Sequence, residues 1–188
     1  MAAVLLDRDG VINHNRDQYV TRWEEFQFLP RALAAIANLR RHAVAVVTNQ
    51  SAVGRGLLAP DTLAAIHRRM LTHCARHGAI IDGIFACSHA PWDGCGCRKP
   101  RPELLLRAMR TLNEPPEHCV AIGDGHEDLL AARAAGVPFI LVLTGRGRQT
   151  LSHEACRKHP PLLIAGDLWE ASLAIQDRFD RLSNSRAA

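Results

Sequence analysis

The sequence predicts an α/β protein with a doubly wound (Rossmann-like), mostly parallel sheet flanked by helices. Short apolar runs alternate with segments of helical periodicity, which is the pattern of successive strand–helix–strand units. Polar and acidic residues follow several of these runs, as expected where parallel strands end at a ligand-binding edge. The 188 residues fit one domain, which we place at residues 1–182, with a frayed tail at 183–188.

The first predicted strand ends in two acids. Residues 4–6 are apolar, and Asp7, Asp9 and Gly10 follow within four positions. Because side chains alternate along a strand, Asp7 and Asp9 share a face, and Gly10 allows the backbone to turn away. Two clustered carboxylates repel each other, so this pair favours a hard divalent cation such as Mg²⁺ over a merely solvated turn.

The next segments continue the alternation. Residues 11–28 are polar and aromatic and predict a loop over the carboxylates. A helix is expected over 30–42, because a proline opens it and apolar residues recur at helical spacing. Residues 43–48 form a second buried strand that delivers Thr48 to its end. A second helix then runs from Pro60 until a glycine stops it at position 78.

The second half of the chain has the same organisation. We expect a third strand over 80–87, a helix from Pro102, a fourth strand over 119–123, a helix from His126 to Gly136, a fifth strand over 139–143 and an edge strand over 162–165. The fourth strand again ends in an acid, Asp124, and a basic turn at 146–148 follows the fifth. Asp167 and Glu170 form a capping-box pair that begins the last helix.

Composition narrows the class of protein. A net charge of +4 is too mild for nucleic-acid binding, so we expect no nucleic-acid partner, although it suits an anionic small substrate. No apolar stretch reaches a membrane span and no secretory leader is present, so we expect a cytoplasmic protein without a membrane partner, and a monomer. No glycine-rich loop follows the first strand, which argues against dinucleotide-binding and P-loop folds.

Four residues after the third strand predict a zinc site. Cys87, His89, Cys95 and Cys97 supply three thiolates and one imidazole within eleven residues. A set of four ligands closes a tetrahedral site, so Zn²⁺ would be structural and would hold a loop too short to fold alone. The alternative is four free residues in a reducing compartment.

The order and spacing of four segments resemble the motifs of the haloacid dehalogenase (HAD) superfamily of phosphatases. These segments are Asp7-Arg8-Asp9-Gly10-Val11, Thr48-Asn49-Gln50-Ser51, Lys99, and Gly123-Asp124 with Asp128. The resemblance covers about three quarters of the chain. It implies a HAD-like fold and hydrolysis of phosphate monoesters, and the chain has no insertion long enough for a large cap domain.

The resemblance also implies a role for each residue. Asp7 would attack phosphorus and form an aspartyl phosphate, and Asp9 would protonate the leaving oxygen and later activate water. Catalytic Mg²⁺ would be held by Asp7, the backbone carbonyl of Asp9, and Asp124. Thr48 and Lys99, with Asn49 beside them, would bind the phosphoryl oxygens.

The cysteine loop followed by Arg98 and Lys99 is similar to that of a narrower branch, whose members act on heptose bisphosphate or histidinol phosphate. Other features look more like the heptose members, which implies removal of the C7 phosphate of D-glycero-D-manno-heptose 1,7-bisphosphate for cell-envelope polysaccharide. Arg98 and the loop from Asn13 to Tyr19 would then recognise the sugar, and Arg55 the second phosphate, with simple solvation as the alternative for Arg55. Gly125 is a departure, because this branch usually has lysine there, and His126, Arg146 or Arg148 would have to supply the missing positive charge.

Besides transfer of the phosphoryl group to an acceptor other than water, three other functions stay open on the sequence. Two are enzymatic, namely hydrolysis of histidinol phosphate or another small phosphometabolite, and hydrolysis of a nucleic-acid 3′-phosphate. The third is a catalytically silent binding module built on the zinc loop. The presence of Asp7, Asp9, Lys99 and Asp124 together argues against a silent module, which would be free to lose any of them.

Overall fold

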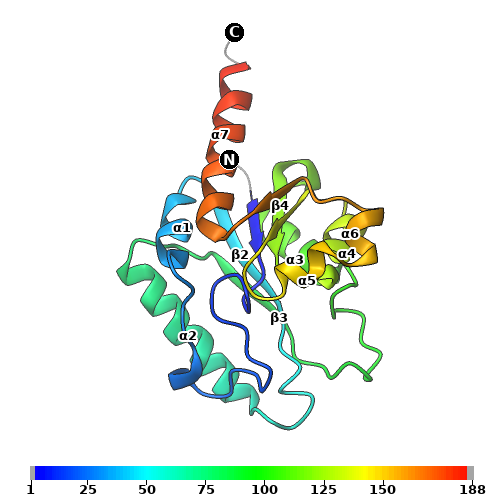
Figure 1. Cartoon of the computed structure of the whole chain (residues 1–188). Helices are drawn as coiled ribbons and strands as arrows, with labels where there is room; N and C mark the ends of the chain where they lie inside the picture. Colours follow the sequence, from blue (N-terminus) through cyan, green and yellow to red (C-terminus); the bar gives the residue numbers. More distant parts are fainter. Residues whose placement is uncertain (1–2, 186–188) are drawn as a thin grey trace.

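A six-stranded parallel sheet forms the centre of the molecule, in the strand order β3-β2-β1-β4-β5-β6 (Figure 1). The computed structural model describes residues 3–185, with side chains over 3–176. The strands are β1 (Ala3–Leu6), β2 (Ala43–Asn49), β3 (Gly83–Cys87), β4 (Cys119–Gly123), β5 (Phe139–Val142) and β6 (Leu163–Ala165). The predicted fold class is therefore confirmed, including the parallel edge strand β6.

The register of the central strands places their carboxyl ends at nearly the same level. Leu6, the last residue of β1, pairs with Val46 of β2 and with Ile122 of β4. The backbone N–H of Asp7 donates to the carbonyl of Ile122 at 2.8 Å. The residues that follow β1, β2 and β4 consequently meet at one edge, at the point where the strand order reverses on either side of β1.

Helices cover both faces of this sheet (Figure 1). The helical segments are η1 (Trp23–Glu25), α1 (Ala32–Asn38), α2 (Pro60–Arg76), α3 (Glu103–Leu112), η2 (Pro116–His118), α4 (His126–Ala134), α5 (Gly147–Leu151), α6 (Glu154–Lys158) and α7 (Leu168–Ser185). Val4 and Leu6 of β1 are buried with α1, α2 and α7, whereas Leu5 is buried with α3, α4 and α6. Because the side chains of β1 point alternately to the two faces of the sheet, this one strand contributes to the hydrophobic core on each face.

Some element boundaries differ from the sequence prediction. The helix expected over 30–42 is shorter, because Arg31 adopts a left-handed backbone (φ 62°) that cannot belong to a right-handed helix. Strand β3 begins at Gly83 rather than 80, and Ile80 is exposed. The basic turn at 146–148 leads into the short helices α5 and α6, which the sequence prediction missed.

The start of α7 has one half of the predicted capping box. The N–H of Glu170 donates to Asp167 Oδ1 at 3.0 Å, whereas Glu170 Oε2 accepts the backbone N–H of Gly166 at 2.7 Å, one residue before Asp167. The helix continues to Ser185, and residues 186–188 of the predicted tail lie outside the described residues. Over the described part of the chain, no helix is both long and apolar enough to cross a membrane.

Candidate active site

Asp7 and Lys99 form a buried ion pair at the end of β1. Lys99 Nζ donates to Asp7 Oδ1 at 2.8 Å and to the carbonyl of Val47 at 2.7 Å, and it lies 2.5 Å from Asp128 Oδ1. Lys99 is 4% exposed. Burial alone would lower the pKa of Lys99, but Asp128 and Asp7 raise it well above its usual value, so the ammonium stays charged.

Asn49 fixes the backbone that carries this lysine. Its side-chain amide donates to the carbonyl of Lys99, and its Oδ1 accepts the N–H of Lys99, both at 3.1 Å. The last residue of β2 therefore positions Lys99 through the main chain. The predicted contact of Asn49 with phosphate stays a prediction.

Asp9 is oriented by three neighbouring side chains. Arg8 Nη2 and Asn13 Nδ2 donate to its Oδ1 at 2.8 and 2.9 Å, and Gln50 Nε2 donates to its Oδ2 at 2.7 Å. Burial alone would raise the pKa of Asp9, but Arg8 and these hydrogen bonds hold it below its usual value. Gln50 Nε2 also donates to Thr48 Oγ1 at 2.9 Å. The Gln50 amide therefore links Asp9, the predicted proton carrier, to Thr48, a predicted phosphate-binding residue.

Arg8 is itself held from outside the site. Its side chain is 1% exposed, and its Nη1 lies 3.1 Å from His67 Nε2 of α2. Burial and the nearby Arg8 lower the pKa of His67 to about 4, so the ring is neutral near pH 7 and its Nε2 accepts the Arg8 N–H.

Asp7, Asp124 and Asp128 form a buried acidic cluster. One carboxylate oxygen from each lies within 4.8 Å of the others. Burial, Asp7 and Asp128 raise the pKa of Asp124 to about 8. Burial also raises the pKa of Asp7 to about 6, although Lys99 opposes the shift.

The Asp124 side chain has one oxygen free for a further ligand. Its Oδ2 accepts the N–H of Arg146 at 2.7 Å, whereas its buried Oδ1 has no hydrogen-bond partner among the residues that the structure describes. Gly10 and Gly145 make this burial possible, because a Cβ at either position would lie 2.1 Å from Asp124 Oδ2. Three carboxylates sharing one lysine, with an orphaned oxygen among them, fit a hard divalent cation.

A cavity of about 230 Å³ opens over these residues. It is lined by Asp7, Asp9, Thr48, Asn49, Lys99, Arg98, Arg55 and Tyr19, together with Arg16, Glu127, Asp128 and Arg146 among others. The structure therefore brings every predicted catalytic and substrate-binding residue to one cavity, with Asp124 fully buried beneath it. Five arginines in the lining suit a substrate with more than one anionic group.

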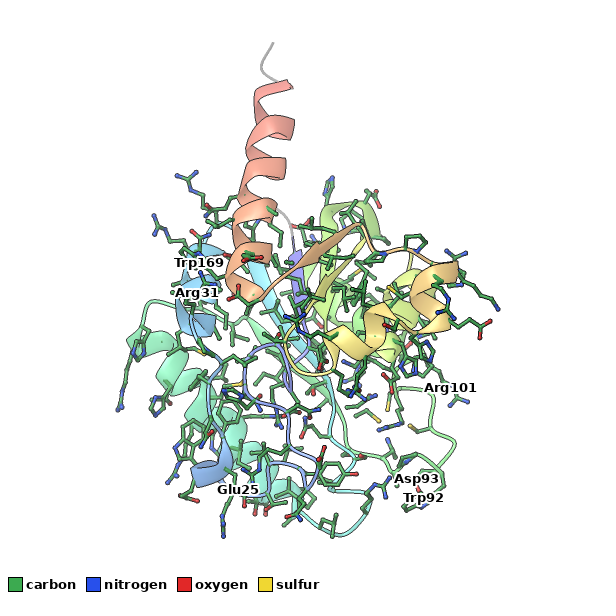
Figure 2. The ribbon with its side chains drawn as sticks, in the orientation of Figure 1. Glu25, Arg31, Trp92, Asp93, Arg101 and Trp169 are labelled. Atoms are coloured by element: carbon green, nitrogen blue, oxygen red, sulfur yellow. The ribbon has the colours of Figure 1, made fainter. Side chains whose placement is uncertain are left out.

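Arg55 lies between two aromatic rings at the rim. Its guanidinium carbon is 4.7 Å from the ring centre of Trp92 and 5.9 Å from that of Tyr19. Trp92 is 68% exposed and lies beside Asp93 on the loop after β3 (Figure 2). The cysteine loop thus reaches the cavity through a cation–π contact.

The four predicted zinc ligands converge on that loop. Cys87 Sγ is 3.7 Å from Cys95 Sγ and 3.6 Å from His89 Nδ1, and Cys97 Sγ is 3.8 Å from Cys95 Sγ and 3.4 Å from His89 Nδ1. A tetrahedral zinc site with bonds of about 2.3 Å has sulfur–sulfur edges of roughly 3.8 Å. The donors and their spacing therefore fit Zn²⁺.

Sequence reasoning gave no role to several residues that complete the site. Arg8, Gln50 and Asp128 lie within the four motif segments, so their positions were available as a signal. Arg146 was considered only as one of three residues that would replace the lysine missing at position 125, because a charged side chain in a turn is most often solvated. Only the fold shows that Arg8 is buried against His67.

Fold and site together define a phosphatase of the HAD type. The parallel sheet and the loops that follow its strands bring a buried carboxylate, a second acid two residues later, a hydroxyl, a lysine and an acidic pair together at one arginine-lined cavity. In agreement, a family model described as HAD-hydrolase-like matches residues 96–171.

Curated relatives narrow the class. The chain is 43% identical over 154 residues to a D-glycero-beta-D-manno-heptose-1,7-bisphosphate 7-phosphatase of Bordetella bronchiseptica, covering 81% of this chain and 86% of that one. It is 40% identical to the protein of the same name from Pseudomonas putida, covering 80% and 87%. The chain belongs to the heptose-1,7-bisphosphate 7-phosphatase family.

Solved structures agree with this placement. The crystal structure of the B. bronchiseptica D,D-heptose 1,7-bisphosphate phosphatase, complexed with magnesium and phosphate, is similar with a TM-score of 0.87 and 37% identity, over 95% of this chain and 99% of that one. The enzyme from Burkholderia thailandensis is similar with a TM-score of 0.70 and 32% identity, over 94% and 99%.

Proposed function

We propose that the protein hydrolyses the C7 phosphate of D-glycero-D-manno-heptose 1,7-bisphosphate. The observation that carries the proposal is the convergence of Asp7, Asp9, Lys99 and Asp124 on one arginine-lined cavity. The names of the relatives support the choice of sugar.

Two half-reactions follow from the geometry. Asp7 attacks phosphorus, so that a carboxylate oxygen–phosphorus bond forms while the bond to the C7 oxygen breaks, and Asp9 gives that oxygen a proton. Asp9 then takes a proton from water, which attacks the aspartyl phosphate and frees both inorganic phosphate and Asp7. Arg8, Asn13 and Gln50 keep Asp9 in place for both transfers.

Mg²⁺ fits the acidic cluster. Asp7, the backbone carbonyl of Asp9 and the orphaned oxygen of Asp124 would hold it, and the relative from B. bronchiseptica was crystallised with magnesium. When bound, the cation reduces repulsion between the anionic substrate and Asp7. Asp128 stays outside this set, because it pairs with Lys99 and accepts the N–H of Gly125 at 3.0 Å.

Zn²⁺ fits the loop cluster in a structural role. Cys87, His89, Cys95 and Cys97 leave no open position, and the nucleophile is supplied elsewhere. The zinc would hold Arg98 and Trp92 against the cavity. We further propose a monomer in the cytoplasm, with no nucleic-acid or membrane partner, where reduced thiols remain available to a metal.

The relatives favour one anomer. Those named for the beta form cover 79–81% of this chain, whereas the mycobacterial relatives named for the alpha form cover 67%. We therefore propose the beta anomer as the better substrate.

A phosphate-release panel with Mg²⁺ tests the assignment. It compares both anomers of the bisphosphate, histidinol phosphate, a 3′-phosphorylated oligonucleotide and an aryl phosphate, with Asp7→Asn as the inactive control. The highest kcat/KM should belong to the beta bisphosphate. A higher value for histidinol phosphate would overturn the choice of sugar, and no hydrolysis of any ester would favour the silent module.

A further inference from the structure

In the empty cavity Lys99 directs its donors at protein oxygens. An ammonium has three N–H donors, and here they are directed at Asp7 Oδ1, Asp128 Oδ1 and the carbonyl of Val47. Both polar atoms of the Asn49 side chain are used by the Lys99 main chain. A second cationic side chain with free N–H groups beside Asp7 would therefore add to the binding of a phosphoryl dianion by Lys99.

Arg146 has donors that are free. Its backbone N–H is bound to Asp124 Oδ2 at 2.7 Å, which fixes the residue beside the acidic cluster. Its guanidinium lines the cavity and makes no hydrogen bond within the described part of the chain. The nearest acid is Glu127, whose Oε2 lies 3.6 Å from Arg146 Nη2, which is an ion pair without a hydrogen bond.

Gly125 leaves the space that this guanidinium uses. A Cβ at position 125 would lie 2.9 Å from Arg146 Nη2, 2.8 Å from Glu127 Oε2 and 3.1 Å from Asp128 Oδ2. Since Arg146 Nη2 and Asp128 Oδ2 surround the same point, the guanidinium is within about 6 Å of the acid that holds Lys99. A side chain at 125 would therefore require the guanidinium of Arg146 and the neighbouring carboxylates to shift from their present positions.

We propose that Arg146 binds the transferring phosphoryl group, and the inorganic phosphate product, from the space opened by Gly125. Glu127 holds the guanidinium while the cavity is empty and yields it to the more highly charged phosphate. The stacked rings of His126 and His153, 4.1 Å apart, support Glu127 from behind, since His126 Nδ1 lies 3.4 Å from its Oε2. The inference rests on the proposed phosphatase reaction but not on the identity of the sugar.

Inorganic phosphate is the probe, measured as a competitive inhibitor of aryl phosphate hydrolysis at saturating Mg²⁺. Arg146→Ala should raise the inhibition constant about 10-fold, because one charge-assisted contact is lost. Arg148→Ala is the matched control, since it removes an exposed arginine of the same segment that does not line the cavity, and it should change the constant less than about 2-fold. Glu127→Gln should lower the constant about 2-fold by removing the competing anion.

A compensating variant separates phosphate binding from structural damage. In the Arg146→Ala background, Gly125→Lys places an ammonium in the vacated space and should restore the inhibition constant to within about 3-fold of wild type. Equal inhibition constants for Arg146→Ala and Arg148→Ala would overturn the inference. A variant too slow to assay is measured by calorimetric titration with phosphate and Mg²⁺, and unchanged affinity there would also overturn it. Because the substrate is an aryl phosphate, failure of the heptose assignment leaves this test intact.

Discussion

The two candidate metal clusters are built in opposite ways. The carboxylates of Asp7 and Asp124 follow directly on strands of the central sheet and are buried. Of the four loop ligands, only Cys87 belongs to a strand, whereas His89, Cys95 and Cys97 lie on a segment without helix or strand and are more exposed. The sheet therefore places the acids whether or not a cation is bound, whereas the loop depends on its ligands for order.

The energetic consequences are also opposite. The fold forces the acids together, and their repulsion is a cost that a cation removes. The loop residues after Cys87 lie outside the helices and strands, so a bound cation would contribute to their order. The comparison predicts that metal removal changes charge at one cluster and conformation at the other.

The largest effect is expected from Asp7→Asn. Without a nucleophile, kcat for the best substrate should fall at least about 10⁴-fold, while the fold is retained. Phosphate release over hours and a thermal melt measure the two properties. Residual turnover above about 1% of wild type would assign the attack to another group.

Cys97→Ser tests whether the loop needs its metal. Zinc content should drop, and limited proteolysis should cut within residues 88–98, because three remaining ligands bind at least about 10-fold more weakly. KM for the bisphosphate should rise more than KM for an aryl phosphate, since Lys99 stays held by Asn49 and Val47. Cys156→Ser, at a buried cysteine outside the cluster, is the control and should keep its zinc.

Stabilisation by Mg²⁺ should depend on pH. Asp7 and Asp124 have pKa values raised to about 6 and about 8. Their raised values mean that the metal-free fold loses stability as pH rises from about 4 towards 8, while Mg²⁺ binds the ionised forms. At a fixed concentration equal to 100 times the Kd at pH 8, Mg²⁺ should raise Tm by roughly 5–10 °C at pH 8 and by less than half of that at pH 5. Asp124→Asn should reduce the pH dependence of the shift to the part that comes from Asp7.

The smallest effect is expected at Trp92, through which the loop contacts the cavity. Trp92→Ala removes an exposed cation–π contact with Arg55 and should raise KM for the bisphosphate about 2- to 5-fold, with little change in kcat. Trp92→Phe keeps an aromatic face and should lose less. An equal rise in KM for a monophosphate would show that Arg55 does not discriminate a second phosphate.

The fold and the central residues of the site could be predicted because they depend on short-range patterns. Buried strands ending in Asp7, Thr48 and Asp124 are visible in the sequence, and parallel strands must end at one edge. The partners of these residues were harder, since Arg8 meets His67 of a distant helix and Arg146 meets Asp124 across 22 positions. The short helices α5 and α6 were missed because each has only five residues, too few to show a periodicity.

The paired hydrogen bonds between Asn49 and the backbone of Lys99 have a consequence for how such an enzyme can diversify. They anchor the lysine to β2 directly after the cysteine loop. The residues at 90–94, between the metal ligands, can therefore be lengthened, shortened or exchanged without relocating the ammonium. Substitutions in this surface loop can therefore change which substrates bind, while the catalytic residues and the reaction stay the same.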